Sequence, residues 1–591
     1  MDFFQFLTMI GGLALFLYGM SLLGEGLSKA SGGRLERILE QLTSNPIKAV
    51  LVGAGVTGVI QSSSATTVMV IGFVNSGIMN LKQAVGIIMG ANIGTTVTAW
   101  ILGLTGIDSS TFWIRLLKPT SFSPILAIVG VAIIMFSKKD RNKNIATIMV
   151  GFAILMFGMD TMSTAVRPLA EVPEFTGILT RFANPILGMA AGTLLTAVIQ
   201  SSSASVGILQ ALCMTGAISY GAAIPIIMGQ NIGTCVTALL SSIGATKNAK
   251  RAALIHLYFN LIGTILFMIV FYTINAIRPF EALQGAATPF GIAMIHSIFN
   301  VACTVCLLPF SNKLVKLASL TIRKKDKQGE EIIGEEEKML SILDSRFLDT
   351  PSYAVEQSRN VAVVMAGMAE KSMNLAIDLI SEYNEEKIEQ IKRLEVSVDR
   401  FEDALGSYLV KLGARNLSGR DSHSLSVILH CIGDFERISD HSYNLMEVAE
   451  EIHKKNLQFS EKALKELEVF GRAIHDILKI TMLSFAEEDL ELAGQVEPLE
   501  EVIDSLNQEV KQRHVKRLRK GKCTIELGFV LSDITTNYER VSDHCSNIAV
   551  CLLEVNEDEF DTHAYMDRLK REDNINFKGQ VMAYGERYRL P

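Results

Sequence analysis

Residues 61–65 of the sequence read QSSSA, and residues 200–204 repeat these letters 139 positions later. The same interval separates NIGT at 92–95 from NIGT at 231–234. A constant interval held over this length indicates an internal duplication, which any fold has to accommodate. Each copy carries Ser, Thr, Gln and Asn inside otherwise apolar sequence. The duplicated unit therefore combines a membrane-like background with polar phrases that need an explanation.

The 591-residue chain divides by composition into an apolar N-terminal part and a charged C-terminal part. Its mean hydropathy is +0.30 and 49% of its residues are hydrophobic, yet 20% are charged. Residues 1–310 hold most of the apolar runs, and 311–591 hold most of the acidic and basic residues. We therefore predict a membrane domain followed by a soluble one. The net charge of −7 averages the two parts and indicates no nucleic-acid partner.

Seven apolar runs are long enough to cross a bilayer, and two more are interrupted by the QSSS phrase. The interrupted runs, 46–77 and 185–219, are each too long for one span, while their halves are too short. Two half-length helices that meet at a polar break predict a re-entrant hairpin, because non-helical backbone at membrane depth must be buried in protein or line a wet cavity. The seven complete runs lie near 3–25, 83–105, 120–136, 145–165, 222–243, 251–274 and 287–310.

Basic residues in short loops predict how the chain is oriented in a cell (inner) membrane. Their distribution puts the N-terminus outside and the C-terminal region in the cytoplasm. Three crossings then separate the starts of the two copies, which predicts inverted repeats, an architecture of secondary transporters that bind substrate near the midplane. We place repeat 1 at about 3–136, repeat 2 at about 145–274 and an extra helix at 287–310. The basic clusters begin at Lys29, Lys138, Lys247 and Arg323.

The C-terminal part contains a second repeat, in which DFERISDH at 434–441 returns as NYERVSDH at 537–544. Long segments rich in Glu, Lys, Leu and Ile, with few Pro or Gly, are typical of helices. We predict an all-α protein, in which a polytopic membrane domain precedes a cytoplasmic helical bundle of two three-helix repeats at 345–565. Residues 311–344 would form a charged linker and 566–591 a polar tail.

A ligand at the duplicated phrases has to be held by neutral groups. Residues 185–243 include no Asp, Glu, Lys, Arg or His, and 48–105 include only Lys48 and Lys82. Hydroxyls and the free N–H groups of half-helix N-termini suit an oxyanion, and hydroxyl and amide oxygens equally suit Na⁺. Close helix packing explains a single Ser-Ser pair, but a polar phrase in both copies favours a site. The candidate ligands are Gln61, Ser62, Ser63, Ser64, Thr66, Asn92, Thr95, Thr96, Gln200, Ser201, Ser202, Ser203, Ser205, Asn231 and Thr234.

The doubled phrase resembles a known family. QSSS in both copies, together with GANIGTT at 90–96 and GQNIGTC at 229–235, is similar to the type II sodium–phosphate cotransporter family. The resemblance covers about 1–310 and implies Na⁺-coupled transport of inorganic phosphate. It also implies that the hairpin tips and the helices that follow them hold phosphate and the co-transported sodium ions.

A further phrase, HxxFN at 256–260 and again at 296–300, also resembles one found in that family after the repeat. For His256 and His296 a hydrogen bond between helices is the simpler interpretation. The first half has nothing comparable between 100 and 136, where some members of the family have an additional cation site. The ratio of Na⁺ to phosphate therefore stays open.

The C-terminal repeat carries Glu-x-x-x-Asp pairs, whose spacing places both carboxylates of a pair on one helix face. Converging pairs are similar to those of carboxylate metal bundles, and carboxylates suit Mg²⁺, Mn²⁺ or iron. A solvated face, or an ion pair with Arg437 or Arg540, explains each pair taken alone. ERISDH and ERVSDH also resemble the PhoU-like family over about 345–560, which implies phosphate signalling and surface metal clusters. The candidate metal ligands are Glu395, Asp399, Glu436, Asp440, Glu500, Asp504, Glu539 and Asp543.

Together with these patterns, the two resemblances imply a sodium-coupled phosphate symporter in the lipid bilayer, regulated by its PhoU-like domain. Two alternatives stay open: a phosphate exporter or a carrier of another oxyanion, and a membrane-anchored protein that senses phosphate for signalling. An enzyme is not expected, because the membrane half lacks a nucleophile–base pair and the soluble half lacks a nucleotide-binding loop. The oligomeric state stays open as well, a homo-oligomer included.

Overall fold

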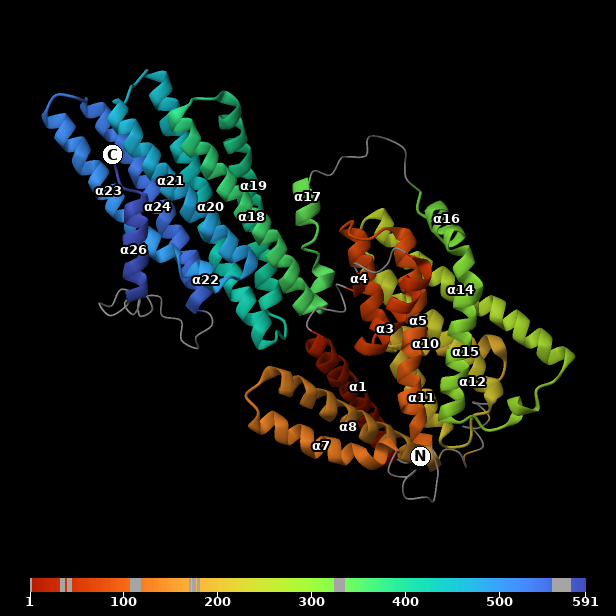
Figure 1. Ribbon diagram of the computed structural model, residues 1–591. Coiled ribbons are helices and arrows are strands. Elements are labelled where there is room, and N and C mark those ends of the chain that lie inside the picture. The colour runs from red at the N-terminus through yellow and green to blue at the C-terminus, as the bar shows by residue number, and fades with distance from the viewer. Residues whose placement is uncertain are drawn as a thin grey trace. The chain divides into compact units, whose positions relative to one another are not determined.

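The computed structural model describes residues 3–31, 38–39, 45–106, 118–168, 172, 177, 181–323, 335–554 and 575–591. Apart from an isolated β-bridge between Ser219 and Ala286, the secondary structure of these residues is helical, as predicted (Figure 1). The chain forms two compact units. The membrane unit comprises Met1–Ile332 and Arg346–Tyr353, and the bundle unit comprises Ile333–Ser345 and Ala354–Pro591.

Seven candidate membrane spans occur among the described residues, each at a predicted apolar run, but the last continues through the helix Ser311–Thr321, which the sequence placed in the charged linker 311–344. Their length and apolar composition, rather than any bound lipid, identify them. They are Phe3–Ser31 (α1), Leu81–Gly106 (α5, Leu81–Gly103, with the turn η1), Pro119–Phe136 (α7), Arg141–Val166 (within α8, Asp140–Val166), Tyr220–Ser241 (α12, Tyr220–Gly233, and α13, Cys235–Ser241), Lys247–Ile277 (α14) and Pro289–Thr321 (α15, Pro289–Leu307, η4, and α16, Ser311–Thr321).

Four shorter apolar helices occupy the two interrupted runs. An Asn-Pro pair starts each run: Asn45 accepts a hydrogen bond from the main chain two residues on, with Pro46 in the first turn, and Asn184 with Pro185 does the same. The QSSS phrase then ends the first helix and starts the second, as predicted. The pairs are α3 (Pro46–Ile60) with α4 (Ser63–Asn75), and α10 (Pro185–Ile199) with α11 (Ser202–Cys213).

The first helix of each pair packs closely against the helix that carries the NIGT phrase. In the first copy α3 lies against α5, and a Cβ added to Gly90 would lie 2.0 Å from the carbonyl oxygen of Val50. In the second copy α10 lies against α12, and a Cβ at Gly229 would lie 2.0 Å from the carbonyl oxygen of Met189. Only glycine allows backbones this close. These glycines therefore serve helix packing.

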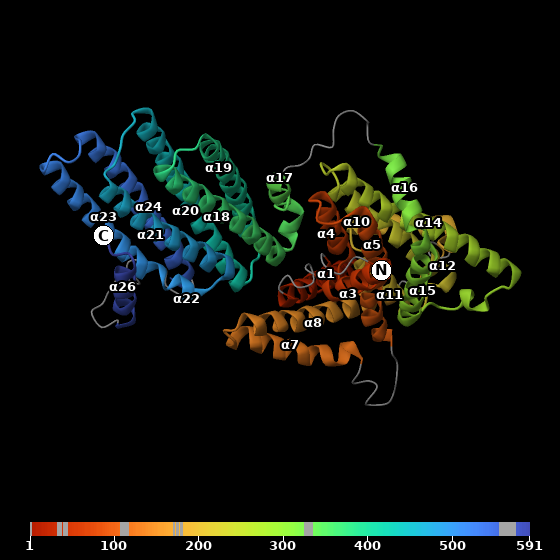
Figure 2. The ribbon, with the colours of Figure 1, turned by 45° about the horizontal axis from the view of Figure 1, so that its top comes forward.

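The remaining helices of the membrane unit surround these pairs. α1 lies along α8, its counterpart in the second copy, and α8 also packs against α7 (Figures 1 and 2). α15 packs on α5, while α14 packs on α4, α5, α12 and α13. A buried apolar cluster that includes Phe259 and Phe299 joins α14 to α15 and to the two NIGT helices. The second helices of the pairs, α4 and α11, are mostly buried, whereas the first helices, α3 and α10, expose apolar side chains such as Leu51 and Val198.

The bundle unit contains two repeats of three long helices. The last helices of the two repeats, α20 and α24, pack against each other and carry the repeated DFERISDH and NYERVSDH phrases. The first repeat consists of α18 (Pro351–Ser381), α19 (Glu385–Gly413) and α20 (Gly419–Lys454). The second consists of α21 (Glu461–Glu487), α23 (Val496–Arg519) and α24 (Ile525–Glu554), with the shorter α17 (Glu335–Leu340), α22 (Leu490–Ala493) and α26 (Ile575–Arg587) beside them.

Residues 346–353 lie in the membrane unit, although the sequence places the start of the regulatory domain at 345. The cause is an aromatic contact. The rings of Phe347 and Tyr353 each lie 5.4 Å from the ring of Phe73 on α4. Phe347 is fully buried. The segment therefore packs on the second helix of the first pair.

The predicted polar tail contains α26 and is anchored beyond it. Tyr588 and Leu590 are buried, and the Tyr588 hydroxyl donates a hydrogen bond to Asp476 on α21. The polar composition of the tail does not indicate this contact, because the buried side chains of Tyr588 and Leu590 are enough to hold the segment in place. Residues 324–334 of the predicted linker and 566–574 of the predicted tail lie outside the described residues.

Candidate functional site

Each helix pair turns at a glutamine in the left-handed backbone conformation. Gln61 has φ 61° and ψ 21°, and Gln200 has φ 59° and ψ 20°. This region is uncommon for a residue with a Cβ, and it ends each first helix. The following serine caps the next helix: Ser62 Oγ accepts from the N–H three residues on at 3.1 Å, and Ser201 Oγ does so at 3.2 Å. The first half of the phrase therefore builds the turn.

The two turns, which we call the tips, meet each other. Ser63 Oγ lies 3.5 Å from Ser202 Oγ, and both side chains are buried. These serines hold equivalent positions in the two copies, 139 residues apart. Equivalent residues of the two copies therefore face each other at this contact. Both serines are also the first residues of helices, α4 and α11, whose early N–H groups have no helical acceptor.

Two threonines on the NIGT helices reach across to the opposite tip. Ser203 Oγ donates to Thr98 Oγ1 at 3.3 Å, and Thr237 Oγ1 lies 3.3 Å from Ser64 Oγ. The two contacts are equivalent under the same 139-residue relation. Neither threonine was among the sequence-predicted ligands. The signal was present, because 98 and 237 are themselves a matched pair that extends NIGT by one helical turn.

The two glutamines, although equivalent in sequence, have different surroundings. Thr98 Oγ1 donates to Gln61 Oε1 at 2.7 Å, and Gln61 is buried. Gln200 is exposed and makes no side-chain hydrogen bond within the described part of the chain. Its expected donor, Thr237, instead bonds at 2.8 Å to the carbonyl oxygen of Thr234 on its own segment. We call Gln61 latched, because its side chain is hydrogen-bonded to the NIGT helix of its own copy, and the Gln200 side chain is not latched in this sense.

The remaining predicted ligands are buried close in sequence to these contacts but bond to their own helices. Asn92 donates to the carbonyl oxygen four residues earlier at 2.9 Å, and Asn231 does so at 3.0 Å. Hydroxyls of the other residues also donate to carbonyls three or four residues earlier. They belong to Thr66, Thr95, Thr96, Ser205 and Thr234. The structure brings Ser63, Ser64, Ser202 and Ser203 into direct cross-copy contact and bonds Gln61 to Thr98 of its own copy. The other predicted ligands lie near these residues in sequence.

The tips are electrically neutral except for the helix ends. On α3, α4, α5 and α10 to α13 the charged side chains are Lys48 and Lys82, both exposed near helix starts. The partial positive charge at the N-termini of α4 and α11 is therefore the main fixed field at the tips. Hydroxyls and N–H groups arranged in this way can bind an oxyanion without a cationic side chain.

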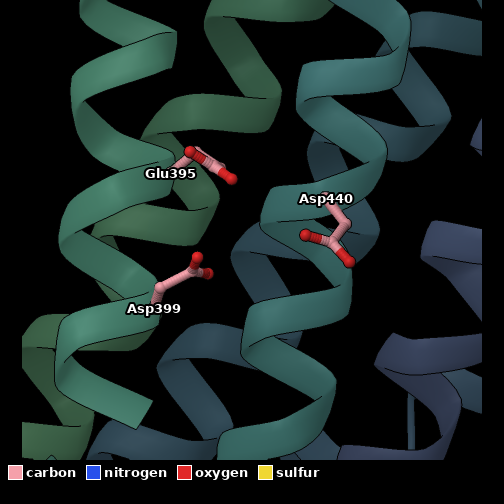
Figure 3. A group of neighbouring side chains, drawn as sticks. All are labelled: Glu395, Asp399 and Asp440. Carbon is pink, nitrogen blue, oxygen red and sulfur yellow. The ribbon is translucent and has the colours of Figure 1, made fainter. Parts of the chain in front are cut away.

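In the bundle unit, six of the eight predicted metal ligands form two clusters. Glu395 and Asp399 of α19 and Asp440 of α20 each place an oxygen within 4.8 Å of the others (Figure 3). Figure 3 shows their carboxylates directed into the gap between α19 and α20. Burial, followed by the charges of Asp399 and Asp440, raises the pKa of Glu395. Such a cluster repels itself unless protons or a cation neutralise it.

The second cluster is equivalent and lies on the second repeat. Glu500 and Asp504 of α23 and Asp543 of α24 meet the same 4.8 Å criterion. Burial and then the charge of Glu539 raise the pKa of Asp543. Glu436 and Glu539 fall outside the two groups. The ion pairs weighed as the alternative also occur, since Arg437 lies 3.4 Å from Asp440 and Arg540 lies 3.6 Å from Asp543.

The ends of the repeated bundle phrase join the two repeats. His544 Nδ1 lies 2.8 Å from Asp434 Oδ1, and His441 Nδ1 lies 2.9 Å from Asn537 Oδ1. Each contact links the first residue of one copy of the phrase to the last residue of the other. The spacing of carboxylates within one helix does not indicate this role, because both contacts join residues of different helices. The phrase therefore holds α20 against α24.

Seven candidate spans, duplicated pairs of half-length helices with touching polar tips and a separate helical bundle define a polytopic membrane carrier with a soluble domain. The chain belongs to the Na⁺/Pi-cotransporter family, whose model matches residues 15–164 and 154–296. The PhoU domain model matches residues 363–449 and 467–552. The protein is therefore a phosphate transporter with a PhoU domain, and not an enzyme.

Relatives are found for the whole chain and for each part. The "Putative inorganic phosphate export protein YjbB" of Salmonella typhimurium is 24% identical over 552 residues, which cover 93% of this chain and 97% of the relative. The uncharacterized protein YqeW of Bacillus subtilis is 30% identical over 315 residues, covering 52% of this chain and 96% of the relative. The crystal structure of PhoU from Pseudomonas aeruginosa matches with a TM-score of 0.33 at 20% identity, covering 34% of this chain and 96% of that structure.

Proposed function

We propose that phosphate binds between the two tips and is carried across the membrane there. The observation that carries this proposal is the 3.5 Å approach of Ser63 Oγ to Ser202 Oγ, one from each copy. A phosphate between the tips would replace this contact and accept hydrogen bonds from both hydroxyls. The N–H groups at the starts of α4 and α11 would supply further donors. Other oxyanions offer the same acceptors, so competition with sulfate and arsenate is part of the test.

The site would open to each side of the membrane in turn if Gln61 and Gln200 exchanged their surroundings. In the present state Thr98 holds Gln61, while Gln200 is exposed. Because the copies are equivalent in sequence, the opposite state would have Thr237 hold Gln200 and Thr98 release Gln61. If the copies are inverted and each pair re-enters the membrane from one side, this exchange opens the tips alternately to the two sides.

The direction of transport that we propose is export of inorganic phosphate. The relative that matches almost the full length of this chain is named as a phosphate export protein. Uptake by Na⁺ symport is the second candidate, because the matching family model is that of Na⁺/Pi cotransporters. Na⁺ would then bind near the tips, where hydroxyl and amide oxygens are available and no carboxylate competes.

Purified protein in proteoliposomes separates these candidates. Labelled phosphate is placed inside or outside, with Na⁺ on either side or replaced by choline. Stimulation of uptake by an inward Na⁺ gradient supports symport, and phosphate movement without that stimulation supports the carrier proposed for export. Phosphate binding without flux would instead support the membrane-anchored sensor.

Ser63→Ala and Ser202→Ala should each weaken phosphate binding about 10-fold or more, since hydrogen bonds to charged groups contribute about 1.5–3 kcal/mol. Ser319→Ala, on α16 and bonded to its own helix, is the matched control.

We further propose that the bundle lies in the cytoplasm and regulates transport by binding divalent cations. Two three-carboxylate clusters at equivalent positions provide the hard oxygen ligands that Mg²⁺, Mn²⁺ or iron prefer. The membrane unit offers a route for the effect. Residues 346–353 belong to the membrane unit and pack on α4. The helix α18 begins within this segment, at Pro351, and continues into the bundle unit. Calorimetric titration of the purified protein with Mn²⁺ tests binding, with Asp399→Asn and Asp504→Asn expected to remove one site each.

A further inference from the structure

A groove lies between α7 and α8, near the end where residues 137–139 join these two neighbouring helices (Figures 1 and 2). Its volume is about 670 Å³. Apolar side chains of α7, among them Ile128, Ala132 and Phe136, form most of its lining, and Ser137 and Asn142 line its polar end. The groove therefore has a long apolar part and one polar end, as a lipid molecule has.

The polar end has hydrogen-bonding capacity that the described residues do not use. Ser137 Oγ accepts two hydrogen bonds, from the main-chain N–H of Lys139 at 3.3 Å and from Asn142 Nδ2 at 3.2 Å. Within the described part of the chain the Ser137 hydroxyl donates none in return. α8 begins directly after Lys139, which gives its first turn no side-chain cap. The early N–H groups of α8 therefore present the partial positive charge of a helix start at this end of the groove.

Four basic side chains flank the polar end. Residues 138–143 read KKDRNK, with four basic residues and one acidic residue. Arg141 lies four residues before Ile145, which lines the groove, so the two side chains share one face of α8. The basic residues are all exposed and form no ion pair among the described residues; they are Lys138, Lys139, Arg141 and Lys143. Positive charge thus gathers where the groove is polar.

The tendency of basic residues to gather in cytoplasmic loops explains the charge by itself. It does not explain a groove at the same place, or a helix start without a cap. By contrast, Asn45 caps the start of α3 and Asn184 caps the start of α10. The duplication does not explain the cluster either, because 139 positions later residues 277–282 read IRPFEA. The three features together indicate a ligand with an apolar chain and an anionic head.

We propose that this groove binds an anionic phospholipid. Its acyl chain would lie along the apolar residues of α7. Its phosphate would accept hydrogen bonds from the Ser137 hydroxyl and from the first N–H groups of α8, with Lys138 and Arg141 beside it. Basic pockets between membrane helices bind acidic lipid headgroups in this way. A zwitterionic lipid fits less well, because the four basic side chains would repel its ammonium group.

The experiment measures thermal unfolding of the purified full-length protein in detergent with added lipid. Phosphatidylglycerol is compared with phosphatidylethanolamine of the same acyl chains. Because a ligand of the native state raises its melting temperature, phosphatidylglycerol should stabilise the wild type more than phosphatidylethanolamine does. Lys138→Gln/Arg141→Gln should raise the phosphatidylglycerol concentration for half effect about 10-fold or more, since each basic residue contributes about fivefold near an anionic headgroup. Lys313→Gln/Lys316→Gln, at two exposed lysines of α16, is the matched control.

A second pair of variants tests the groove separately from the charge. Ala132→Phe places a ring in the groove and should also weaken the effect of phosphatidylglycerol about 10-fold, because the acyl chain loses its contacts. Val131→Phe is its control, at the neighbouring position of α7 that does not line the groove. Both positions are exposed, so both variants should fold. Mass spectrometry of the protein released from detergent should find phosphatidylglycerol retained by the wild type and by Val131→Phe.

The outcomes distinguish a bound lipid from a diffuse attraction. Equal stabilisation of the wild type by the two lipids overturns the inference. A loss in Lys138→Gln/Arg141→Gln without a loss in Ala132→Phe overturns it as well, because attraction to a charged surface needs no groove. Losses in both variants and in neither control support it. The inference does not rest on the proposed function, since Ser63→Ala and Ser202→Ala should leave the effect of phosphatidylglycerol unchanged.

Discussion

Thr98 donates a hydrogen bond to Gln61 at 2.7 Å and accepts one from Ser203 at 3.3 Å, so one hydroxyl joins the two copies. Its counterpart Thr237 makes a single 3.3 Å contact with Ser64 and otherwise bonds within its own segment. Residues that are equivalent in sequence therefore make different contacts in this state. In a carrier, such a difference between equivalent residues distinguishes one conformation from the other.

Replacing these threonines should reveal the asymmetry. Thr98→Val leaves the buried Gln61 Oε1 without its donor, which should destabilise this state by roughly 1–3 kcal/mol. Thr237→Val loses only one partly buried contact and should cost less. Thermal unfolding without phosphate measures the difference, with Thr161→Val as control. Equal losses for the two variants would contradict the assignment of Gln61 as the latched tip.

At the scale of elements, close backbone contact decides how the paired helices pack. α3 meets α5, and α10 meets α12, through glycines at equivalent positions, including Gly90 and Gly229. The two NIGT helices then differ, because α5 runs unbroken to Gly103, whereas the second is divided at Thr234 into α12 and α13. The apolar run at 222–243 predicted one continuous helix there.

Alanine substitution tests the close contacts. Gly90→Ala and Gly229→Ala place a Cβ about where a carbonyl oxygen lies, so the helices have to separate, and overpacking of this kind costs about 1–3 kcal/mol or more. Gly55→Ala lies on α3, the helix against which Gly90 packs, but no atom lies within 4 Å of an added Cβ there, so this variant should be neutral or slightly stabilising. Melting temperature and the yield of folded protein in detergent are the measurements. Tolerance of both Gly90→Ala and Gly229→Ala would refute the packing argument.

At the scale of the whole molecule, the proposed influence of the bundle on transport can pass along the chain that joins the two units. Residues 346–353 belong to the membrane unit, and α18, which begins at Pro351, continues from them into the bundle unit. Phe347 fits against Gly72 of α4, where an added Cβ would lie 2.8 Å from its ring. Arg346 Nε donates to the carbonyl oxygen of Ser241 at 2.9 Å, at the C-terminal end of α13. The segment thus touches a helix from each copy.

Removing the aromatic contact should uncouple the two units functionally. Phe347→Ala removes a fully buried ring and should destabilise the membrane unit by roughly 3–5 kcal/mol. Under conditions where it stays folded, any effect of Mn²⁺ on phosphate flux should disappear while Mn²⁺ binding persists. Flux in proteoliposomes and calorimetry are the two readouts. A conservative Phe347→Leu should retain most of the effect, and full Mn²⁺ regulation in Phe347→Ala would argue against this route.

The carboxylate clusters make bundle stability depend on pH and metal. Burial first, then neighbouring carboxylates, raise the pKa of Glu395 above 4.5 and that of Asp399 above 3.8. Between the pKa values of the unfolded state and the raised pKa values of the folded state, the folded protein binds more protons than the unfolded protein. The free energy of unfolding of the metal-free bundle should therefore fall as pH rises through this range. At pH 7 with chelator, Asp399→Asn should raise the melting temperature of the bundle by roughly 1–3 °C, because exposed charge pairs contribute under about 1 kcal/mol.

When Mn²⁺ is added, the wild type should have a higher melting temperature than Asp399→Asn. The wild type gains stability from the bound ion, whereas Asp399→Asn gains less because one of the two clusters has lost a ligand. Glu389→Gln, on the exposed surface of α19, is the control and should behave as wild type. Identical Mn²⁺ shifts in all three proteins would exclude a metal site at this cluster.

Much of the architecture follows from local patterns. The seven spans and the four half-length helices follow from runs of apolar residues, and the breaks follow from QSSS because a polar phrase cannot continue a lipid-facing helix. Tertiary packing, rather than a local pattern, decides the contacts of Thr98 and the contact between the two copies of the bundle phrase. Asp434 meets His544 only because α20 and α24 pack together. No local pattern indicates which partner a hydroxyl or carboxylate will meet.

The sequence by itself determined the duplication, the membrane and bundle parts and the residues at each turn, because apolar periodicity, capping and backbone preference act over a few residues. Only the tertiary structure decided that Ser63 meets Ser202, that Gln61 is latched while Gln200 is not, and that Phe347 packs on the membrane unit. These outcomes depend on the packing of helices that are distant in sequence, where a displacement of an ångström decides whether two groups can bond.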